Sequence, residues 1–237
     1  MIFINNFDLS EKILTEICIF LKKKKTKLSE NSSDGRLNSA INEDEILSDL
    51  ESYCLSNEWF SVTMNLKLVK PKARSWYDFA IESEDRTFFL PVNIKVSECH
   101  SADNLNCKLG LYYALTGLIP DFNNGISWED YFEKLYNNID TNMNNDYYFL
   151  IVDKKNRERV FYTSLKTINT LSPNGNNLPF QCKWDDNIER NFRCHKNSKT
   201  FLLTNLGESI RRRGLIVTSF CSFFPEYYGL KEEVNNE

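Results

Sequence analysis

Residues 91–98 read Pro-Val-Asn-Ile-Lys-Val-Ser-Glu, and residues 76–81 read Trp-Tyr-Asp-Phe-Ala-Ile. Both stretches are largely apolar and rich in residues that favour β-structure, and Glu84-Asp85 between them is typical of a turn. We therefore predict a hairpin whose strands cover 76–82 and 87–96. The remaining elements must pack around these two strands.

Polar side chains gather on one face of the predicted hairpin. Residues i and i+2 of a strand point the same way, so Asn93 and Lys95 share a face, and Asp78 can lie opposite them. A helix predicted over 37–55 adds Glu43, which falls within the apolar face of that helix. A carboxylate is unusual there unless it is paired or binds a metal ion. The alternative is a partly exposed glutamate at the end of the apolar stripe.

The rest of the chain alternates between helical and strand-like patterns. Apart from the hairpin and the 37–55 helix, we predict helices over 7–28, 102–116, 127–138 and 205–213, and strands over 60–69, 146–153, 159–165 and 215–220. Gly117 is expected to end the 102–116 helix. The order of elements predicts an α/β (α+β) fold, in which a mixed central β-sheet is flanked by helices.

Composition excludes several classes of protein. Of 237 residues, 8 are glycine, 6 are proline and 41% are hydrophobic, which indicates a globular chain with an ample core. The seven cysteines show no Cys-x-x-Cys spacing and the N-terminus resembles no signal peptide, so we expect reduced thiols and a cytoplasmic location. No apolar run reaches the roughly 20 residues that cross a bilayer, so no membrane partner is expected.

Histidine and overall charge narrow the function further. The two histidines, His100 and His195, lie in no recognisable motif, which argues against a Ser-His-Asp or Cys-His hydrolase. The net charge of −4 argues mildly against a protein that binds nucleic acid by bulk charge alone. Local clusters of basic residues decide that question instead.

The polar residues of the hairpin suit the hydrolysis of a phosphodiester. Carboxylates such as Asp78 and Glu43 hold Mg²⁺ through hard oxygen atoms. The ion polarises a phosphate and lowers the pKa of a water molecule. A lysine in the position of Lys95 can orient or deprotonate that water and offset negative charge in the transition state.

With these residues in this order, the chain resembles the PD-(D/E)XK nucleases and, within them, the type II restriction endonucleases. Tyr77-Asp78 corresponds to the Pro-Asp, Asn93-Ile94-Lys95 to the (D/E)XK, and Glu43 to the acid that many of these enzymes carry on a preceding helix. The layout spans roughly residues 37–153. The resemblance implies a restriction-endonuclease-like fold, Mg²⁺-dependent cleavage of a specific double-stranded DNA sequence, a homodimer and a bacterial cytoplasmic location.

The resemblance also assigns roles. Asp78 is the main metal ligand, Asn93 a weak or indirect one, Glu43 the compensating ligand, and Lys95 the residue that activates water.

Two positions depart from the family pattern. Tyr77 stands where proline is common, which matters little. Asn93 stands where Asp or Glu is expected, and its amide carbonyl binds a metal ion more weakly than a carboxylate does. Three explanations are open. Glu43 or Glu98 supplies the missing charge, Asn93 is an engineered change that allows a DNA complex without cleavage, or the chain is a natural inactive relative.

Amide and basic side chains supply candidate DNA contacts. Amide groups can read base edges, and basic groups can hold phosphates. Simpler explanations exist, since Asn-Gly favours turns and consecutive arginines complement a helix C-terminus. The candidate DNA-binding residues are Arg36, Asn38, Lys70, Lys72, Arg74, Asn174, Asn176, Asn177, Gln181, Lys183, Arg211, Arg212 and Arg213.

We predict one nuclease domain over 1–230 and a polar tail over 231–237. Within the domain, 1–36 is an N-terminal helix and loop, 37–165 the catalytic core, and 166–230 the DNA-recognition and dimerisation elements. Two other functions are open. One is a nickase or junction resolvase of the same fold, and the other is a catalytically inactive DNA-binding relative.

Overall fold

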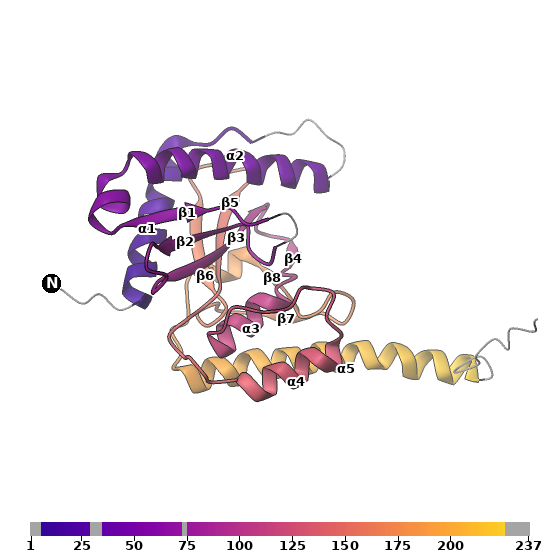
Figure 1. Ribbon diagram of the computed structural model, residues 1–237. Helices are drawn as coiled ribbons and strands as arrows, with labels where there is room; N and C mark the ends of the chain where they lie inside the picture. Colours follow the sequence, from indigo (N-terminus) through magenta and orange to yellow (C-terminus); the bar gives the residue numbers. More distant parts are fainter. Residues whose placement is uncertain (1–5, 29–34, 73–74, 226–237) are drawn as a thin grey trace, which may run out of the picture.

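The computed structural model describes residues 6–28, 35–72 and 75–225, with the backbone alone described over 35–40. Its centre is a mixed five-stranded sheet (Figure 1). The strands lie in the spatial order β1 (Leu66–Val69), β2 (Phe79–Ser83), β3 (Phe89–Ser97), β5 (Tyr148–Asp153) and β6 (Val160–Ser164). The predicted α/β (α+β) class, a mixed sheet flanked by helices, is confirmed.

Neighbouring strands with a short connection are antiparallel, and the parallel pair of the central sheet has a long connection. β1, β2 and β3 form an antiparallel meander, which confirms the predicted hairpin as β2–β3. β3 and β5 are parallel, and parallel neighbours need a long crossover. The crossover contains β4 (Ala102–Asn104), α3 (Lys108–Thr116) and α4 (Trp128–Asn138). β6 then returns antiparallel to β5.

Two helices cover one face of the sheet. α1 (Asn6–Lys24) lies against β6, and α2 (Gly35–Ser56) lies against β1 and β3 (Figure 1). Alternate residues of the strands point into this layer, as the pleat of a β-strand requires. The largest fully buried members of the cluster are Ile13, Leu14, Ile17, Ile46, Leu50 and Phe79.

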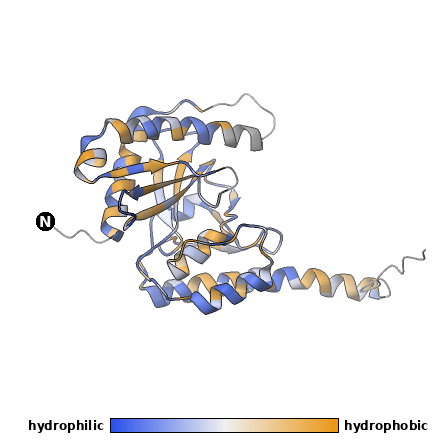
Figure 2. Cartoon of the chain, in the orientation of Figure 1, coloured by the Kyte–Doolittle hydropathy of each residue, from blue (hydrophilic) through white to orange (hydrophobic). Residues whose placement is uncertain are grey.

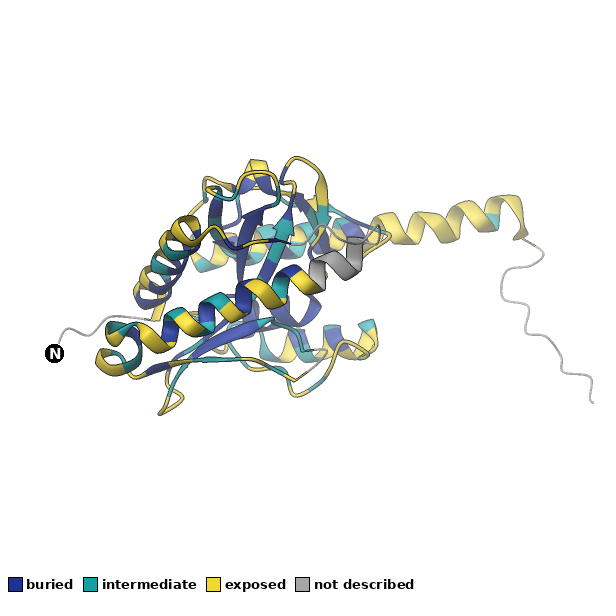
Figure 3. Cartoon of the chain, turned by 90° about the horizontal axis from the view of Figure 1, so that it is seen from above, coloured by how far each residue is buried: buried dark blue, intermediate teal, exposed yellow. Residues whose placement is uncertain are grey.

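The opposite face is covered by α3, α4 and α5 (His195–Phe223). A small antiparallel sheet, ordered β4-β8-β7, joins them through β7 (Ser172–Pro173) and β8 (Phe180–Lys183). A short 3-10 helix, Trp184–Asn187, follows β8, and the Trp184 side chain is fully buried in this second cluster. Figure 3 shows the central strands as buried between the two layers.

The predicted strand over 60–69 is wrong in its first half. Trp59–Thr63 forms a short π-helix, and β1 begins only at Leu66. The Ser61 N–H donates to Asn57 O at 2.9 Å and the Met64 N–H to Trp59 O at 3.0 Å, so local bonds pair the backbone here in place of a neighbouring strand, while Phe60 is buried in the layer beneath α2.

The predicted helix over 102–116 is wrong in its first half as well. Residues 102–104 pair with β8 as strand β4, and Asn106 has a φ of 46°, which a right-handed helix cannot contain. α3 therefore starts at Lys108. Gly117, with a φ of 69°, ends it as predicted.

The predicted short helix over 205–213 and strand over 215–220 are both wrong, because α5 runs unbroken through them. β-propensity largely measures packing against neighbouring strands. No strand of the described chain lies beside 215–220, so only a helix pairs the backbone groups of this segment. The end of α5 projects from the body and is largely hydrophobic (Figure 2).

Candidate functional site

Asp78 and Asn93 lie side by side where β2 begins. The register pairs Phe79 with Val92, and the Asp78 N–H donates to Val92 O at 2.9 Å. The Ile94 N–H donates to Asp78 Oδ2 at 2.6 Å, so a side chain replaces a backbone acceptor at this point of the ladder. That hydrogen bond fixes the Asp78 carboxylate beside Asn93.

Asn93 presents a carbonyl oxygen without a partner. Its Oδ1 is buried and accepts no hydrogen bond from the described residues. The Tyr147 hydroxyl donates to Trp76 O at 2.6 Å. Burial raises the pKa of Tyr147 well above its usual range, and a hydrogen bond with the Asn93 side chain opposes this rise. Buried polar atoms without a partner are rare, so this oxygen is a candidate contact for a bound water, ion or ligand.

Tyr147 is held in position by α3. A Cβ atom on Gly110 would lie 2.5 Å from Cδ1 of the Tyr147 ring, so glycine is needed for the helix to come this close. The ring also packs against Trp76 and Phe149. Our sequence analysis missed Tyr147 as a site residue. The available signal was a phenolic hydroxyl in an apolar buried run, where it requires a hydrogen-bond partner.

Glu43, one of the two acids that the sequence left open for the missing charge, joins this group from α2. Its pKa is raised to about 7, first by burial and then by the negative charge of Asp78, against the opposing effect of the Lys95 ammonium. The pKa of Asp78 is raised too, because burial outweighs the Ile94 N–H and Lys95. A half-buried carboxylate whose pKa is raised by burial and by a neighbouring carboxylate is typical of functional sites.

Replacing Glu43 by glutamine should stabilise the metal-free protein at pH 8 more than at pH 5. The pKa of Glu43 is about 7 in the folded chain and 4.5 as its ordinary value, so ionisation costs the folded state stability as the pH rises through this range. Because Glu43 is only half-buried, we expect a gain of about 1 kcal/mol, or roughly 2–4 °C. Thermal melts in a chelator measure it. Glu45→Gln, on an exposed position of the same helix, is the control, and an equal gain at both pH values would refute the assignment.

Lys95 shares a face of β3 with Asn93. Its positive charge opposes the rise in the pKa of both carboxylates and also acts on the thiol of Cys107, the residue just before α3. The Lys95 ammonium forms no hydrogen bond or ion pair with the described residues. A partly buried cation beside two carboxylates is thus free to meet an anionic ligand.

Glu98, the other acid considered for the missing charge, is engaged elsewhere. It lies beyond the end of β3, roughly 16 Å along the chain from Asn93 at about 3.3 Å per residue. Its side chain is exposed and pairs with Lys155 Nζ at 3.1 Å, which lowers the pKa of Glu98. Glu43, and not Glu98, is therefore the acid that lies close to Asp78.

The oxygen atoms of the site fit a cation such as Mg²⁺. Within the described part of the chain, no group of three or more His, Cys, Asp or Glu side chains is placed to hold a metal ion. The set here is two carboxylates, Asp78 and Glu43, and the unpartnered Oδ1 of Asn93. Hard oxygen ligands in small number suit Mg²⁺, which keeps several positions for water and phosphate.

The amide-rich loop divides into structural and exposed residues. Asn174 is buried, donates to Asn104 Oδ1 at 2.6 Å and accepts the N–H groups of Asn176 and Asn177. It also donates to Gln181 Oε1 at 3.3 Å. Asn174 thus has a structural role in the turn, because its side chain is already hydrogen-bonded. Gln181 lies on β8 and uses its Oε1 in these bonds. Asn176 and Asn177 stay exposed.

The three arginines do not complement a helix C-terminus, because α5 continues for ten residues beyond Arg213 to Phe223. Arg211 and Arg212 pair with Glu208. Arg212 also donates to Pro173 O at 3.0 Å, and Arg213 donates to Gly175 O and Asn176 O at 2.8 Å each. These bonds tie α5 to the β7 turn.

The other predicted DNA contacts are dispersed. Lys70 pairs with Glu51 at 2.8 Å, whereas Lys72 and Lys183 are exposed. Arg74 lies outside the described residues. Arg36 and Asn38 lie in α2, where the structure describes the backbone alone.

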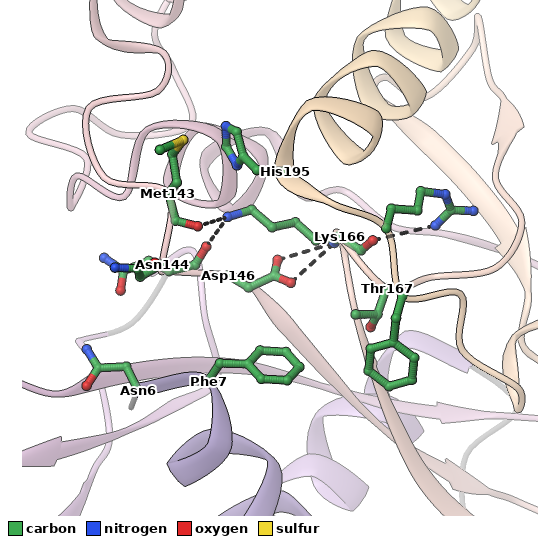
Figure 4. Close-up of a pocket in the computed structure, with 11 residues that line it drawn as sticks. Asn6, Phe7, Met143, Asn144, Asp146, Lys166, Thr167 and His195 are labelled. Atoms are coloured by element: carbon green, nitrogen blue, oxygen red, sulfur yellow. Dashed lines mark hydrogen bonds between the residues drawn. The ribbon is translucent and has the colours of Figure 1, made fainter. Parts of the chain in front are cut away.

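A separate cavity of about 580 Å³ lies away from the hairpin, between the start of α1 and the loops around β5 and β6 (Figure 4). Lys166 and Asp146 are hydrogen-bonded, whereas the buried Nδ1 of His195 has no partner among the described residues. Lys166 Nζ donates to Met143 O at 2.9 Å and Asn145 O at 2.5 Å, and the Asp146 carboxylate accepts the Lys166 N–H. These bonds hold the loops together.

The chain matches no protein-family model and no curated protein sequence. None of the helices in residues 6–28, 35–72 and 75–225 is long and apolar enough to cross a membrane.

Proposed function

We propose that this protein is a Mg²⁺-dependent nuclease, a type II restriction endonuclease of the PD-(D/E)XK class that cleaves double-stranded DNA at a specific sequence. One observation carries the proposal. Glu43 from α2, Asp78 from the start of β2, and Asn93 and Lys95 from β3 form one half-buried cluster. If Asp78, Asn93 and Lys95 matched the nuclease pattern by chance, there would be no reason for a carboxylate from a separate helix to lie close to them.

The side chains have separate tasks in this proposal. Asp78, Asn93 Oδ1 and Glu43 would hold Mg²⁺, which supplies a Lewis acid for the phosphate and a water of lowered pKa. The Ile94 N–H keeps the Asp78 carboxylate oriented. Glu43, with a pKa of about 7, loses its proton near neutral pH and becomes the second carboxylate. Lys95 orients the attacking water and offsets the negative charge that develops on the phosphate.

Double-stranded DNA, a homodimer and a bacterial cytoplasm complete the proposal. Two cuts in a symmetric sequence call for two-fold symmetry. The N-terminus of α3, close to Lys95, lies beside a polar hollow whose exposed amide groups suit base edges. The hollow is lined by Asn106, Lys108, Asn124, Trp128, Asn176, Asn177, Leu178 and Arg213.

Asn93 favours a second candidate, a DNA-binding relative without catalysis. An asparagine in place of an acid removes one negative charge from the metal site, and a weakly held cation supports little hydrolysis. A nickase or junction resolvase, the remaining alternative, would use the same residues on a different DNA substrate.

Digestion of plasmid and phage DNA with Mg²⁺ or Mn²⁺ tests the proposal. Discrete fragments are expected from a sequence-specific endonuclease. Nicked circles alone, or a preference for branched DNA, would identify the nickase or resolvase. Tight DNA binding without cleavage would identify the inactive relative. A chain that neither cleaves nor binds DNA would contradict the proposal.

A further inference from the structure

The last ten residues of α5, 214–223, form a segment that we call the arm. Figure 1 shows it projecting from the body of the protein, and Figure 3 shows it exposed. A Cβ atom added to Gly214, its first residue, would meet no atom within 4 Å. At about 1.5 Å per residue the arm is roughly 15 Å long.

One face of the arm is apolar. Ile216, Phe220 and Phe223 are spaced at i, i+4 and i+7, so they lie on one stripe, and Phe220 packs against Phe224 with ring centroids 5.5 Å apart. Leu215, Ile216, Val217, Phe220, Phe223 and Phe224 are 43–74% exposed. Thr218 and Ser222 lie on the opposite face. Contiguous apolar surface of this kind marks an interaction site.

The base of the arm is fixed in direction. Arg212 and Arg213 bind the carbonyl oxygens of Pro173, Gly175 and Asn176 just before the arm begins. The arm is thus a helix held away from the body and not a loosely attached end. The arm continues α5, but its glycine and β-branched residues have low helix propensity and its side chains make few contacts with the body. A partner that covers the apolar stripe would therefore stabilise it.

We propose that this partner is a second copy of the same chain, so that two arms pair across a two-fold axis. Residues 214–224 contain no Asp, Glu, Lys, Arg or His. DNA would require basic residues, and a helix on a membrane surface carries Lys or Arg on its polar face, where this arm has Thr218, Ser219 and Ser222. An uncharged apolar stripe is complementary to itself, as a two-fold interface requires.

The surface available is more than half of what a standard interface uses. Leu215 lies beside Ser222 and not on the stripe, and the other five apolar residues offer on the order of 500 Å² per copy, taking about 150–250 Å² for an aromatic side chain and less for an aliphatic one. A standard interface uses about 800 Å² per partner. This pairing identifies the arm as the surface through which the homodimer of the proposed function forms. The inference depends on the arm alone, so it does not require nuclease activity.

Sedimentation equilibrium and light scattering of the full chain, without DNA or metal, test the pairing. The full chain should have twice the 27.8 kDa monomer mass at micromolar concentration. Phe220→Asp/Phe223→Asp should lower the mass to that of the monomer. Thr218→Asp/Ser222→Asp adds the same charge to the opposite face of the same helix and should remain dimeric.

Three results would overturn the pairing. The first is a monomeric full chain at tens of micromolar. The second is an equal loss of the dimer in both double variants, which would assign the effect to melting of the helix. The third is a full chain that is monomeric in solution but binds phosphatidylcholine–phosphatidylglycerol vesicles through the arm. DNA cleavage is measured separately, so failure of the dimer and failure of the nuclease remain distinguishable.

Discussion

Lys95→Ala is expected to reduce DNA cleavage about a thousandfold while leaving the fold intact. Lys95 is the cation of the cluster, and it forms no hydrogen bond or ion pair with the described residues. The alanine variant therefore leaves no described partner unpaired. In our proposal the ammonium orients water and offsets charge on the phosphate, contributions worth about 10²–10⁴-fold each. Single-turnover cleavage of plasmid DNA measures the loss, and thermal melting verifies the fold.

Lys67→Ala is the matched control for this variant. Lys67 lies on β1 and pairs with Glu82 on the solvent side of the same sheet, so its loss should leave cleavage unchanged. Lys95→Arg separates two roles of the lysine. Arginine keeps the positive charge but cannot lose its proton, so partial activity would indicate charge compensation, and no activity would indicate a base. Full activity of Lys95→Ala would remove the lysine from the mechanism.

Asn93→Asp is expected to raise the cleavage rate at limiting Mg²⁺ at least about tenfold, which corresponds to about 1.4 kcal/mol. The substitution places a carboxylate where the structure has a buried, unpartnered carbonyl oxygen beside Asp78. A charged oxygen binds Mg²⁺ more strongly than a neutral amide does. The same change should destabilise the metal-free protein, because a third carboxylate is added to a half-buried pair. Titration of the cleavage rate against Mg²⁺ and melting in a chelator measure the two effects.

Asn137→Asp introduces the same charge on an exposed position of α4 and should change neither property. If Asn93→Asp cleaves DNA and the chain with Asn93 does not, Asn93 is the cause of the inactive site. Equal rates for the two chains at every Mg²⁺ concentration would contradict the prediction and show that Asn93 Oδ1 does not contact the ion.

Local patterns in the sequence predicted much of the fold. The apolar run over 146–153 became the buried strand β5, because a strand covered on both faces has no polar alternation. Ser127 caps α4 by accepting the Asp130 N–H at 3.0 Å, and Gly117 ends α3. These features depend on residues within a few positions of one another, so sequence alone carries them.

Predictions from local patterns were wrong where the secondary structure of a segment depends on which other segments lie beside it. Residues 102–104 lie in a strand because β8 is available beside them, and Asp103 Oδ2 accepts Trp184 Nε1 at 2.6 Å from 81 residues away. The residues after Arg213 lie in a helix because no strand is beside them. Neither neighbour can be read from the segment itself.

The sequence by itself determined that Asp78, Asn93 and Lys95 share a face. Side chains alternate between the two faces of a strand, so residues 93 and 95 point the same way, and the hairpin brings Asp78 opposite them. Only the tertiary structure decided that Glu43 and not Glu98 lies beside Asp78, and that Tyr147 meets the Asn93 amide. The tertiary structure also showed that the Asn174 side chain is hydrogen-bonded within a turn. The physical reason is that alternation along a strand is fixed by local geometry. Contacts between residues far apart in the sequence depend instead on how helices and sheets pack against one another. That packing is determined by the close fit of buried side chains throughout the chain.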